Sequence, residues 1–306
     1  MRVVDYFAGL GGFTLGATRA GATVVAAINH WPRAVEMHRA NHPAVEARCE
    51  DLTRYDPRDL PAFDVLVASP ACQGHSRARG VARGGALDRR WDPSRATAWS
   101  VVDTVEVCRP RGVVVENVGD FLRWELFALW REALERLGYG VTVNVLNAAA
   151  WGVPQDRARA FVTAVRGKAA PSVAVPRCEP VAVSSVLDFG EGAWSLVSGR
   201  VASTRARVAR GRQELGCDRF VMPYNGSSRT GRSLARPLGT VTAADRWAVV
   251  DGDRMRMLRV EELRACMGFP DHYRLPSSRA DATAMLGNAV VPAVAESAVR
   301  AVMEAA

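Results

Sequence analysis

Short apolar runs alternate with amphipathic stretches over the first 165 residues of the chain. Six runs of strand type, rich in valine and alanine, occupy residues 2–7, 23–29, 64–69, 112–118, 140–148 and 160–165. Stretches with a helical pattern lie between several of them, such as "RAVEMHRANH" at residues 33–42. Apolar strands separated by about 10 to 15 residues of helical pattern predict a parallel sheet that is covered on both faces. We therefore predict an α/β fold with a doubly wound, mostly parallel sheet.

The pattern weakens after residue 165. Residues 166–260 mix short apolar pieces with arginine-rich stretches such as "STRARVARGRQ" and show little periodicity. A helical pattern returns near residue 259, and residues 282–306 form an apolar helical stretch. We predict a first domain at residues 1–165, a smaller irregular domain at residues 166–260, and a C-terminal segment at residues 261–306 that packs back on the first domain.

The charge of the chain points to an anionic partner. The formal net charge is +8, and nearly all of the positive charge is arginine, since Lys168 is the only lysine. A guanidinium group offers a planar fork of donors that suits phosphates and guanine edges, so a nucleic acid is the first candidate. A GC-rich genome accounts equally well for the choice of arginine, but not for the sign of the net charge.

Cysteine usage and hydropathy indicate a cytoplasmic protein. The six cysteines are scattered, with no C-x-x-C pair and no His/Cys cluster at metal-ligand spacing, so we expect neither a metal site nor a disulfide framework. The chain begins "MRVVDYFAG", which is typical of a strand and not of a signal peptide. We expect no membrane span, because no apolar stretch of sufficient length is evident.

Candidate site residues follow the predicted strands. Phe7 and the glycines after it follow the first strand, Asn29 ends the second, Cys72 follows the third and Glu116 lies at the end of the fourth. Ligands of doubly wound sheets bind beyond the carboxyl ends of the strands. These positions therefore predict one site at that edge of the sheet.

The turn "DYFAGLGGFTLG" at residues 5–16 is rich in glycine and leads from a strand into a helix. Glycine allows the backbone to approach a ligand closely, and the helix N-terminus offers free N–H groups. Such a turn fits a dinucleotide, S-adenosylmethionine or no ligand at all. Because the turn lacks a Walker lysine, we favour an adenosyl cofactor.

The candidate catalytic residues each have a structural interpretation as well. Cys72 is either a buried inert thiol or a nucleophile whose thiolate is stabilised by Arg77, Arg79 and Arg83. Glu116 ends an otherwise apolar strand and is either held by structural hydrogen bonds or functional. Arg157 and Arg159, two residues apart, share a face if the chain there is extended, although surface arginines in salt bridges are the simpler interpretation.

Taken together, the motifs resemble those of the DNA cytosine-5 methyltransferases in both order and separation. The matching blocks are "FAGLGGF" (7–13), "ACQ" (71–73), "ENV" (116–118), "QDRAR" (155–159), "RPLGTVT" (236–242), "LRVEELRACMGFPDHY" (258–273) and "GNAVVP" (287–292). The resemblance leaves only about residues 166–235 unmatched, where this family has its variable target-recognition segment. It implies a Rossmann-like, S-adenosylmethionine-dependent methyltransferase fold, with residues 1–165 as the catalytic and cofactor-binding domain and residues 166–260 as the target-recognition domain.

The resemblance also implies roles for individual residues. Cys72 would add to carbon 6 of a flipped-out cytosine in double-stranded DNA, Glu116 would protonate the ring at N3, and Arg159 would contact O2 with support from Arg157. The stretch at residues 74–91 would be a closing loop. The resemblance implies cofactor contacts from Phe7, Ala8, Gly9, Leu10, Gly12, Asn29, His30, Trp31, Asp51, Leu52 and Asn288. It implies DNA contacts from Gln73, Ser76, Arg77, Arg79, Gln155, Arg229, Arg232, Thr240 and Thr242.

The chain departs from the family pattern at two positions. Asn29 stands where the family usually has an acidic residue for the ribose hydroxyls, which predicts weaker cofactor binding. Ala71 stands before the nucleophile, where the family usually has proline, and Pro70 lies one position earlier. The loss of the proline ring is expected to loosen the backbone at Cys72.

The motifs leave some alternatives open. The same thiolate chemistry would also modify a cytosine in tRNA, or would transfer a one-carbon group other than a plain methyl from a different donor. A catalytically silent DNA-binding relic is a third interpretation. We expect a monomer in a bacterial or phage-infected cell, cytoplasmic and associated with the nucleoid. The recognition sequence and a partner restriction endonuclease cannot be deduced from the motifs.

Overall fold

The computed structural model describes residues 1–71, 97–224, 230–244 and 246–306 and divides the chain into two compact units. Unit 1 comprises Met1–Leu146, Ala158–Val175 and Val290–Ala306, and unit 2 comprises Asn147–Arg157 and Pro176–Ala289. The units do not divide at residue 260: residues 261–289 belong to unit 2, and residues 290–306 belong to unit 1.

Unit 1 is built on a seven-stranded sheet in the order β3-β2-β1-β4-β5-β7-β6. The strands β1 to β5 pair in parallel, and β7 is antiparallel to β5. This arrangement confirms the predicted doubly wound, mostly parallel sheet, and all six predicted strands are present. The strands are β1 (Arg2–Tyr6), β2 (Thr23–Asn29), β3 (Glu46–Cys49), β4 (Val65–Ala68), β5 (Gly112–Asn117), β6 (Tyr139–Asn147) and β7 (Ala158–Arg166).

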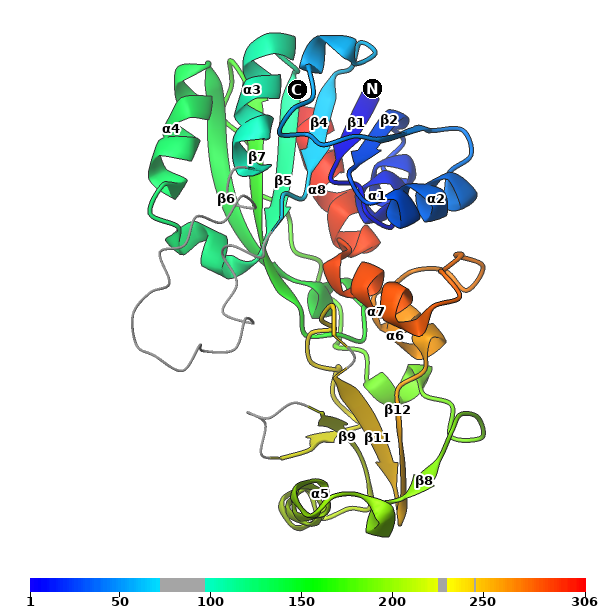
Figure 1. Ribbon diagram of the computed structural model, residues 1–306. Coiled ribbons are helices and arrows are strands. Elements are labelled where there is room, and N and C mark those ends of the chain that lie inside the picture. Colours follow the sequence, from blue (N-terminus) through cyan, green and yellow to red (C-terminus); the bar gives the residue numbers. More distant parts are fainter. Residues whose placement is uncertain (72–96, 225–229, 245) are drawn as a thin grey trace. The chain divides into compact units, whose positions relative to one another are not determined.

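Helices cover both faces of this sheet (Figure 1). On one face, Val101 and Val105 of α3 and Trp130 of α4 join a buried core with side chains of the central strands. On the other face α1 packs against α8, and a Cβ added to Gly112 of β5 would lie 2.3 Å from Val302. The helices are α1 (Gly12–Arg19), α2 (Pro32–Asn41), α3 (Trp99–Cys108), α4 (Phe127–Arg136) and α8 (Pro292–Ala305), with the short 3-10 helices η1 (Pro57–Asp59) and η3 (Gly119–Arg123).

The contact between α1 and α8 requires glycine at two positions. A Cβ added to Gly12 would lie 2.0 Å from the carbonyl oxygen of Val290, and one added to Gly16 would lie 2.6 Å from the Cβ of Ala295. Distances this short exclude any side chain, since the backbone itself would have to move. Gly12 of the "FAGLGGF" turn and Gly16 of α1 therefore allow α1 to pack closely on residues 290–296.

The apolar stretch near the C-terminus forms two helices instead of one. Helix α7 (Arg279–Asn288) belongs to unit 2, α8 belongs to unit 1, and residues 289–291 between them are not helical. By length and composition, Arg279–Ala305 would suffice to cross a membrane, yet 72% of its most apolar window is buried within the protein. Burial of this extent is usual for helices of a protein core.

Unit 2 contains a five-stranded antiparallel sheet in the order β10-β9-β11-β12-β8. Its core is formed by Val208 of α5 with Phe220, Met222, Val250 and Met255 of the sheet. Residues 166–260 are thus more regular than their weak periodicity predicted. The elements of unit 2 are η4 (Ala148–Trp151), η5 (Val183–Val186), β8 (Ser195–Leu196), η6 (Val197–Gly199), α5 (Ala202–Leu215), β9 (Arg219–Pro223), β10 (Arg232–Ser233), β11 (Trp247–Asp251), β12 (Arg254–Met257), α6 (Val260–Cys266) and α7.

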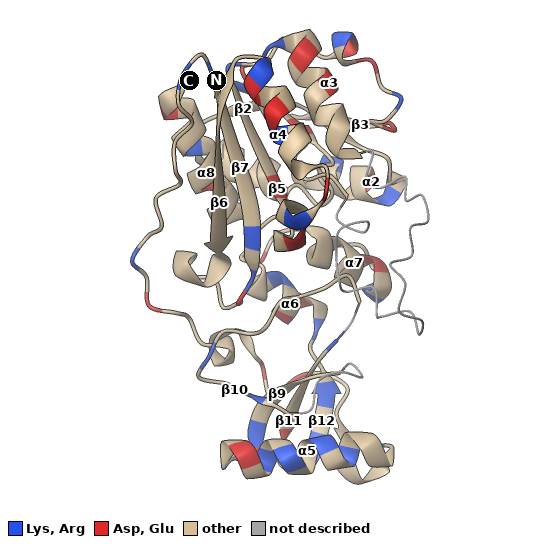
Figure 2. Cartoon of the chain, turned by 90° about the vertical axis from the view of Figure 1, so that its left-hand side faces the viewer, with Lys and Arg blue, Asp and Glu red and all other residues tan. Residues whose placement is uncertain are grey.

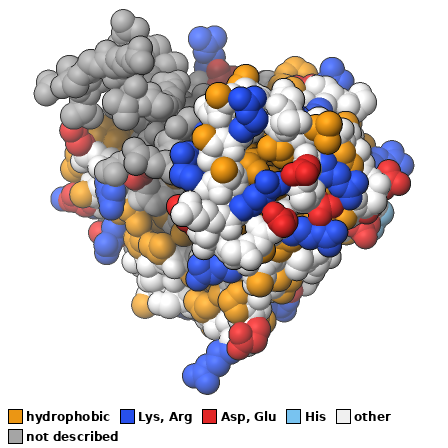
Figure 3. Space-filling view, turned by 90° about the horizontal axis from the view of Figure 1, so that it is seen from below, with side chains coloured by type: hydrophobic (Ala, Val, Ile, Leu, Met, Phe, Trp, Pro, Cys, Tyr) orange, Lys and Arg blue, Asp and Glu red, His pale blue; other side chains and the backbone are white. Residues whose placement is uncertain are grey.

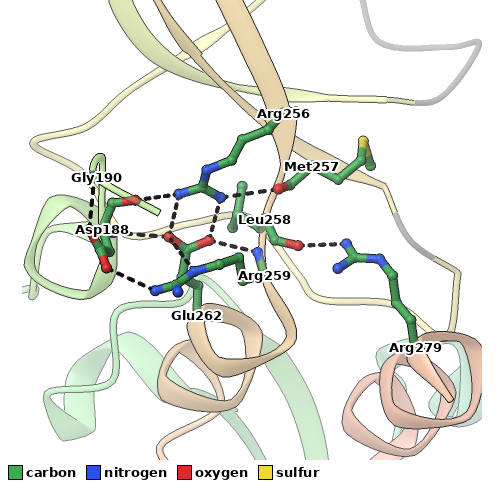
Figure 4. A network of polar contacts seen from close by, with 8 residues as sticks. All are labelled: Asp188, Gly190, Arg256, Met257, Leu258, Arg259, Glu262 and Arg279. Atoms are coloured by element: carbon green, nitrogen blue, oxygen red, sulfur yellow. Dashed lines mark hydrogen bonds and ion pairs between the residues drawn. The ribbon is translucent and has the colours of Figure 1, made fainter. Parts of the chain in front are cut away.

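A buried ion pair connects the sheet of unit 2 to its helices. Arg256 of β12 and Glu262 of α6 form two hydrogen bonds of 2.7 and 2.8 Å, and their side chains are only 2% and 1% exposed. Asp188 lies beside the pair: its carbonyl oxygen accepts a bond from Arg256, and its N–H donates to Glu262 (Figure 4). Arg259 also belongs to this network, because it donates a hydrogen bond to the Asp188 carboxylate. The network fixes the strand β12 on the helix α6 that follows it.

Candidate active site

The glycine-rich turn after β1 has an unusual backbone. Phe7 has a φ of +58°, and among the described residues other than glycine only Phe7 and Arg109 have a positive φ. Gly9 and Gly11 follow with φ of +52° and +90°. Neighbouring strands hold the turn: Ala8 donates its N–H to the carbonyl oxygen of Ile28 at 3.1 Å, and the Ser69 hydroxyl donates to that of Phe7 at 3.3 Å. Strained backbone that is fixed in this way is typical of ligand sites.

Asp5, on the strand before the turn, binds the first turn of α1. The residue preceding α1, Gly11, has no side chain to cap the helix. Instead, the Asp5 carboxylate accepts the N–H of Thr14 at 3.0 Å and its hydroxyl at 2.7 Å, and Nε2 of His38 lies 2.9 Å from the same hydroxyl. Burial raises the pKa of Asp5 to about 7 and lowers the pKa of His38 to about 3. This buried chain of polar groups connects β1, α1 and α2.

The next predicted cofactor residues lie at the ends of β2 and β3. The side-chain oxygen of Asn29 accepts the N–H of Trp31 at 2.9 Å, at the start of α2, and Trp31 is half-buried while His30 is exposed. Asp51 accepts hydrogen bonds from the side chain and the N–H of Thr53, which lower the pKa of the Asp51 carboxyl.

Unit 1 therefore brings most of the predicted cofactor residues to the carboxyl edge of three neighbouring strands. These are the turn residues Phe7, Ala8, Gly9, Leu10 and Gly12, together with Asn29, His30, Trp31, Asp51 and Leu52. Asn288 is exposed near the end of α7 and belongs to unit 2.

Glu116 and Arg159 meet on neighbouring strands of unit 1. In the antiparallel pair β5 and β7, Glu116 lies opposite Phe161, and Asn117 lies opposite Ala160. Nε of Arg159 is 3.3 Å from the Glu116 carboxylate, and the two side chains are 15% and 8% exposed. The strands thus bring together a carboxylate and a guanidinium that are 43 positions apart in the chain, since 159 − 116 = 43.

The two residues before Cys72 are held beside this pair. The side-chain amide of Asn117 donates to the carbonyl oxygen of Pro70 at 3.1 Å, and Ala71 donates its N–H to the Thr97 hydroxyl at 3.1 Å. Cys72 is next in the chain but lies outside the described residues, as do the predicted DNA contacts Gln73, Ser76, Arg77, Arg79 and Arg229.

Arg157 and Arg159 have different surroundings, although the sequence predicted a shared face. Arg157 belongs to unit 2, where its buried guanidinium donates at 2.9 Å to the carbonyl oxygens of Val241, Gly287 and Ala289. The chain there is not yet part of a strand, since β7 begins at Ala158. Arg157 therefore holds three backbone segments together and does not face an open site.

Gln155 plays a similar part within unit 2. Its side chain is fully buried, donates to the carbonyl oxygen of Cys266 at 2.9 Å and accepts the N–H of Val241 at 2.7 Å. In this conformation Gln155 is inaccessible to DNA.

Two of the other predicted DNA contacts that the structure describes bind Asp156. Arg232 pairs with the Asp156 carboxylate at 2.9 Å, and the Thr240 hydroxyl donates to the Asp156 carbonyl oxygen at 2.9 Å. The Thr242 hydroxyl donates to the carbonyl oxygen of Ala244 at 3.1 Å. All three side chains are partly accessible and belong to unit 2.

Many basic residues of unit 2 lie on α5 and the adjoining strands (Figure 2). Acidic groups lie among them: Arg212 pairs with Asp218 and Asp253, and Arg219 and Arg254 both pair with Asp251. Figure 3 shows the same mixture of basic, acidic and apolar side chains on the face that it displays. This surface is therefore not a continuous basic patch.

Two further residues, Asn117 and Thr97, contact the segment that precedes Cys72. Asn117 lies in the "ENV" motif but had no assigned role, and the motif itself was the signal for it. Thr97 lies in no motif, so nothing in the sequence indicated its contact with Ala71. In the described ranges, no group of three or more His, Cys, Asp or Glu side chains could hold a metal ion.

Comparisons with known proteins agree with this geometry. A family model described as C-5 cytosine-specific DNA methylase matches residues 1–186 and 200–304. The type II methyltransferase M1.HphI of Haemophilus parahaemolyticus is 28% identical over 98% of this chain and 86% of its own length, and M.HgiDI of Herpetosiphon aurantiacus is 28% identical over 95% and 90%. Among solved structures, an E. coli protein described as a "putative DNA modification methyltransferase encoded within prophage" is similar in fold, with a TM-score of 0.74 at 18% identity over 99% of both chains.

Proposed function

Because the chain belongs to the C-5 cytosine-specific DNA methylase family, we propose that it transfers a methyl group from S-adenosylmethionine to carbon 5 of a flipped-out cytosine in double-stranded DNA. Methylation of DNA cytosine at carbon 5 is the activity of the family. The cofactor, the covalent adduct and base flipping are the finer parts of the proposal.

The observation that carries the proposal is the pairing of Glu116 with Arg159 beside the chain that leads to Cys72. Both side chains are largely removed from water, and Asn117, next to Glu116, binds the carbonyl oxygen of Pro70. A carboxylate, a guanidinium and the approach to a thiol thus share one edge of the sheet. This set suits covalent catalysis on a pyrimidine ring.

Cys72 would act as the nucleophile. Its thiolate would form a bond to carbon 6 of cytosine while Glu116 gives a proton to N3, so that carbon 5 gains the electron density of an enamine. Carbon 5 would then take the methyl group that S-adenosylmethionine supplies. A base removes the proton from carbon 5, the double bond between carbons 5 and 6 reforms, the Cys72 sulfur leaves as a thiolate, and N3 returns its proton to Glu116.

Arg159 would hold the O2 edge of the ring while its contact with Glu116 keeps that carboxylate in place. Arg157 would act through the backbone that it binds, because its guanidinium is occupied by three carbonyl oxygens.

The carboxyl edge of β1 to β3 has the features that an adenosyl cofactor requires. The turn from Phe7 to Gly12 leads into a helix whose N-cap residue, Gly11, has no side chain, so the backbone can approach a ligand closely. Trp31 is half-buried and suits stacking on adenine, and Asp51 is an exposed carboxylate at the same edge. Asn29 would accept a hydrogen bond from a ribose hydroxyl, but its uncharged side chain makes this bond weaker than one to a carboxylate.

DNA would be held in part by residues 72–96. Six arginines and two aspartates fall at residues 72–96, a net charge of +4 that suits phosphate contacts. Base flipping is implied because the attacked atoms of cytosine are inaccessible within a duplex. Target recognition by residues 166–260, a monomeric state and a cytoplasmic location associated with the nucleoid stay predictions.

The proposal is tested by transfer of tritium from labelled S-adenosylmethionine to duplex DNA. We expect transfer by the wild type and none by Cys72→Ala, with Cys178→Ala, an exposed cysteine of unit 2, as the matched control. On a duplex that contains 5-fluorocytosine, the wild type and Cys178→Ala should form a covalent complex that Cys72→Ala cannot form. Transfer that survives Cys72→Ala would refute the mechanism.

The acceptor is tested by offering duplex DNA and tRNA in parallel and by mass analysis of the modified nucleoside. 5-Methylcytosine in DNA supports the proposal, whereas label in tRNA alone, or an adduct heavier than a methyl group, would overturn it.

A further inference from the structure

One peptide group next to the proposed nucleophile is held from both sides. The carbonyl oxygen of Pro70 and the N–H of Ala71 belong to the same planar peptide unit and point in opposite directions. The Asn117 amide binds the oxygen at 3.1 Å, and the Thr97 hydroxyl binds the N–H at 3.1 Å. This plane can no longer rotate unless one of the two hydrogen bonds breaks.

We infer that Thr97 is a positioning residue for the nucleophile: its hydroxyl restrains the Pro70–Ala71 peptide in place of the ring that a proline at position 71 would supply. The inference rests on the proposed role of Cys72, which is joined directly to Ala71. It adds a residue that acts through the backbone and does not touch the substrate.

The hydroxyl of Thr97 is carried on a rigid support. Thr97 lies just before α3, and its carbonyl oxygen accepts the hydroxyl of Ser100 at 2.7 Å. The next residue, Ala98, is buried, and its carbonyl oxygen accepts the indole N–H of Trp130 at 2.9 Å. A support of this kind allows a side chain to fix another segment instead of moving with it.

The aromatic side chains around Trp130 strengthen this support. The ring centroids of Phe121 and Trp130 are 5.4 Å apart, and Trp99 of α3 makes an edge contact with Trp124 at 6.2 Å. Phe121 follows β5 in η3, so the same cluster borders the strand that carries Glu116 and Asn117. The two anchors of the peptide therefore rest on one packed core.

The orientation of this peptide matters for catalysis. Consecutive Cα atoms are about 3.8 Å apart, so the direction in which the chain leaves Ala71 decides where residue 72 begins. Because Asn117 is adjacent to Glu116 on β5, the peptide is fixed relative to the carboxylate that would hold the ring. Misplacement of a reacting group by about 1 Å can lower a rate about 10²-fold.

The identity of residue 71 is part of the inference. Proline has no N–H, so the bond to Thr97 exists only because position 71 holds a residue other than proline, here alanine. Proline instead restricts its own φ to about −65°. Loss of the ring was expected to loosen the backbone at Cys72, and the Thr97 hydrogen bond supplies another restraint at the same point.

The test is a double-mutant cycle between Thr97→Val and Ala71→Pro, with the rate of covalent complex formation on 5-fluorocytosine DNA and the kcat of methyl transfer as readouts. In the Ala71 enzyme, Thr97→Val should lower both rates about three- to tenfold, the worth of one hydrogen bond. In the Ala71→Pro background the same change should cost less than about twofold, because no N–H remains to be bound. Thr97→Ser, which keeps the hydroxyl, should retain the rate.

A structural role alone would give a different pattern. The Kd for S-adenosylmethionine and the melting temperature of Thr97→Val should stay close to those of Thr142→Val, the matched control, whose hydroxyl binds the carbonyl oxygen of Ala170 on the edge strand β6. A wild-type rate for Thr97→Val, or an equal loss in both backgrounds, would overturn the inference. An inactive wild type would overturn the proposed function itself, so the two failures are distinguishable.

Discussion

Nε of Arg159 lies 3.3 Å from the Glu116 carboxylate, across the antiparallel pair of β7 and β5. β7 is the strand that breaks the parallel order of the sheet, and its reversed direction brings its first residues to the edge where β5 ends. A parallel strand in that position would have placed Arg159 at the opposite edge. The antiparallel strand is therefore what allows one sheet to present both charges at the edge where β5 ends.

Replacing Glu116 should impair catalysis far more than folding. In Glu116→Gln the amide keeps the shape of the side chain but has no proton to give to N3, so single-turnover methyl transfer should fall by about 10²-fold or more. Glu36→Gln, an exposed carboxylate of α2, serves as the control. A rate within a factor of about two of the wild type would argue against acid catalysis by Glu116.

Arg157 should matter for stability. Its replacement by methionine removes the donor for three carbonyl oxygens, each of which costs about 1–3 kcal/mol when buried without a partner. We expect Arg157→Met to lower the free energy of unfolding, measured by urea denaturation, by about 3 kcal/mol or more. Arg33→Met, at an exposed pair with Glu36, should change it by less than about 1 kcal/mol. Equal stability of the two variants would contradict the role seen in the structure.

Replacing one member of the Arg256–Glu262 ion pair should destabilise the protein far more than replacing both members together. Glu262→Ala leaves a buried guanidinium without its carboxylate, which typically costs about 3–5 kcal/mol. Replacing both partners together, as Arg256→Met with Glu262→Leu, should recover most of that loss, because no uncompensated charge remains. Urea denaturation of the three proteins measures this, and a double variant as unstable as Glu262→Ala would be the contrary result.

The buried pair of Asp5 and His38 should give opposing contributions to the pH dependence of stability. The pKa of Asp5 is raised to about 7, so the stability it contributes is complete at low pH and is lost as pH rises through that value. The pKa of His38 is lowered to about 3, so its contribution is complete at neutral pH and is lost as pH falls. Between about pH 4 and about pH 6.5 the two slopes cancel.

Replacing either Asp5 or His38 should reveal the pH dependence of stability that the other group causes. In Asp5→Asn the free energy of unfolding should rise more steeply with pH than in the wild type, by about 1.4 kcal/mol per pH unit, and in His38→Gln less steeply by the same amount. Urea denaturation at pH 4.5, 5.5 and 6.5 checks both signs. Slopes that stay parallel to the wild type would show that these groups titrate normally in the folded protein.

The sequence predicted the sheet of unit 1 better than its details. Six strands stood out because of their apolar, valine-rich runs, which are largely buried in all but the edge strand β6. β3 did not stand out, because "EARC" at the other edge of the sheet buries only Ala47. The reversed direction of β7 could not be predicted from its sequence, since a buried strand has the same apolar pattern in either direction. In unit 2, β8 and β10 have two residues each, too few for any periodicity.

The site residues that belong to a sequence motif could be predicted. Those that reach the site only through tertiary contacts could not. Glu116 and Arg159 came from motifs, and unit 1 brings them together. Thr97 meets Ala71 only because the sheet and α3 bring the two segments together. Asp5 could have been found, since a carboxylate within the apolar run "RVVDYF" needs a partner when it is buried.

The discontinuity of unit 1 has a consequence for the order in which the protein is made. Residues 290–306, including α8, pack on α1 and on the sheet, but the ribosome adds them only after the whole of unit 2. Until then the nascent chain must keep the apolar surface beneath α8 open, or cover it with something else. At about 5–20 residues per second this interval lasts several seconds, and a chain released early would lack the helix that covers this part of unit 1. Folding of unit 1 can therefore be completed only after translation has passed the codons of α8.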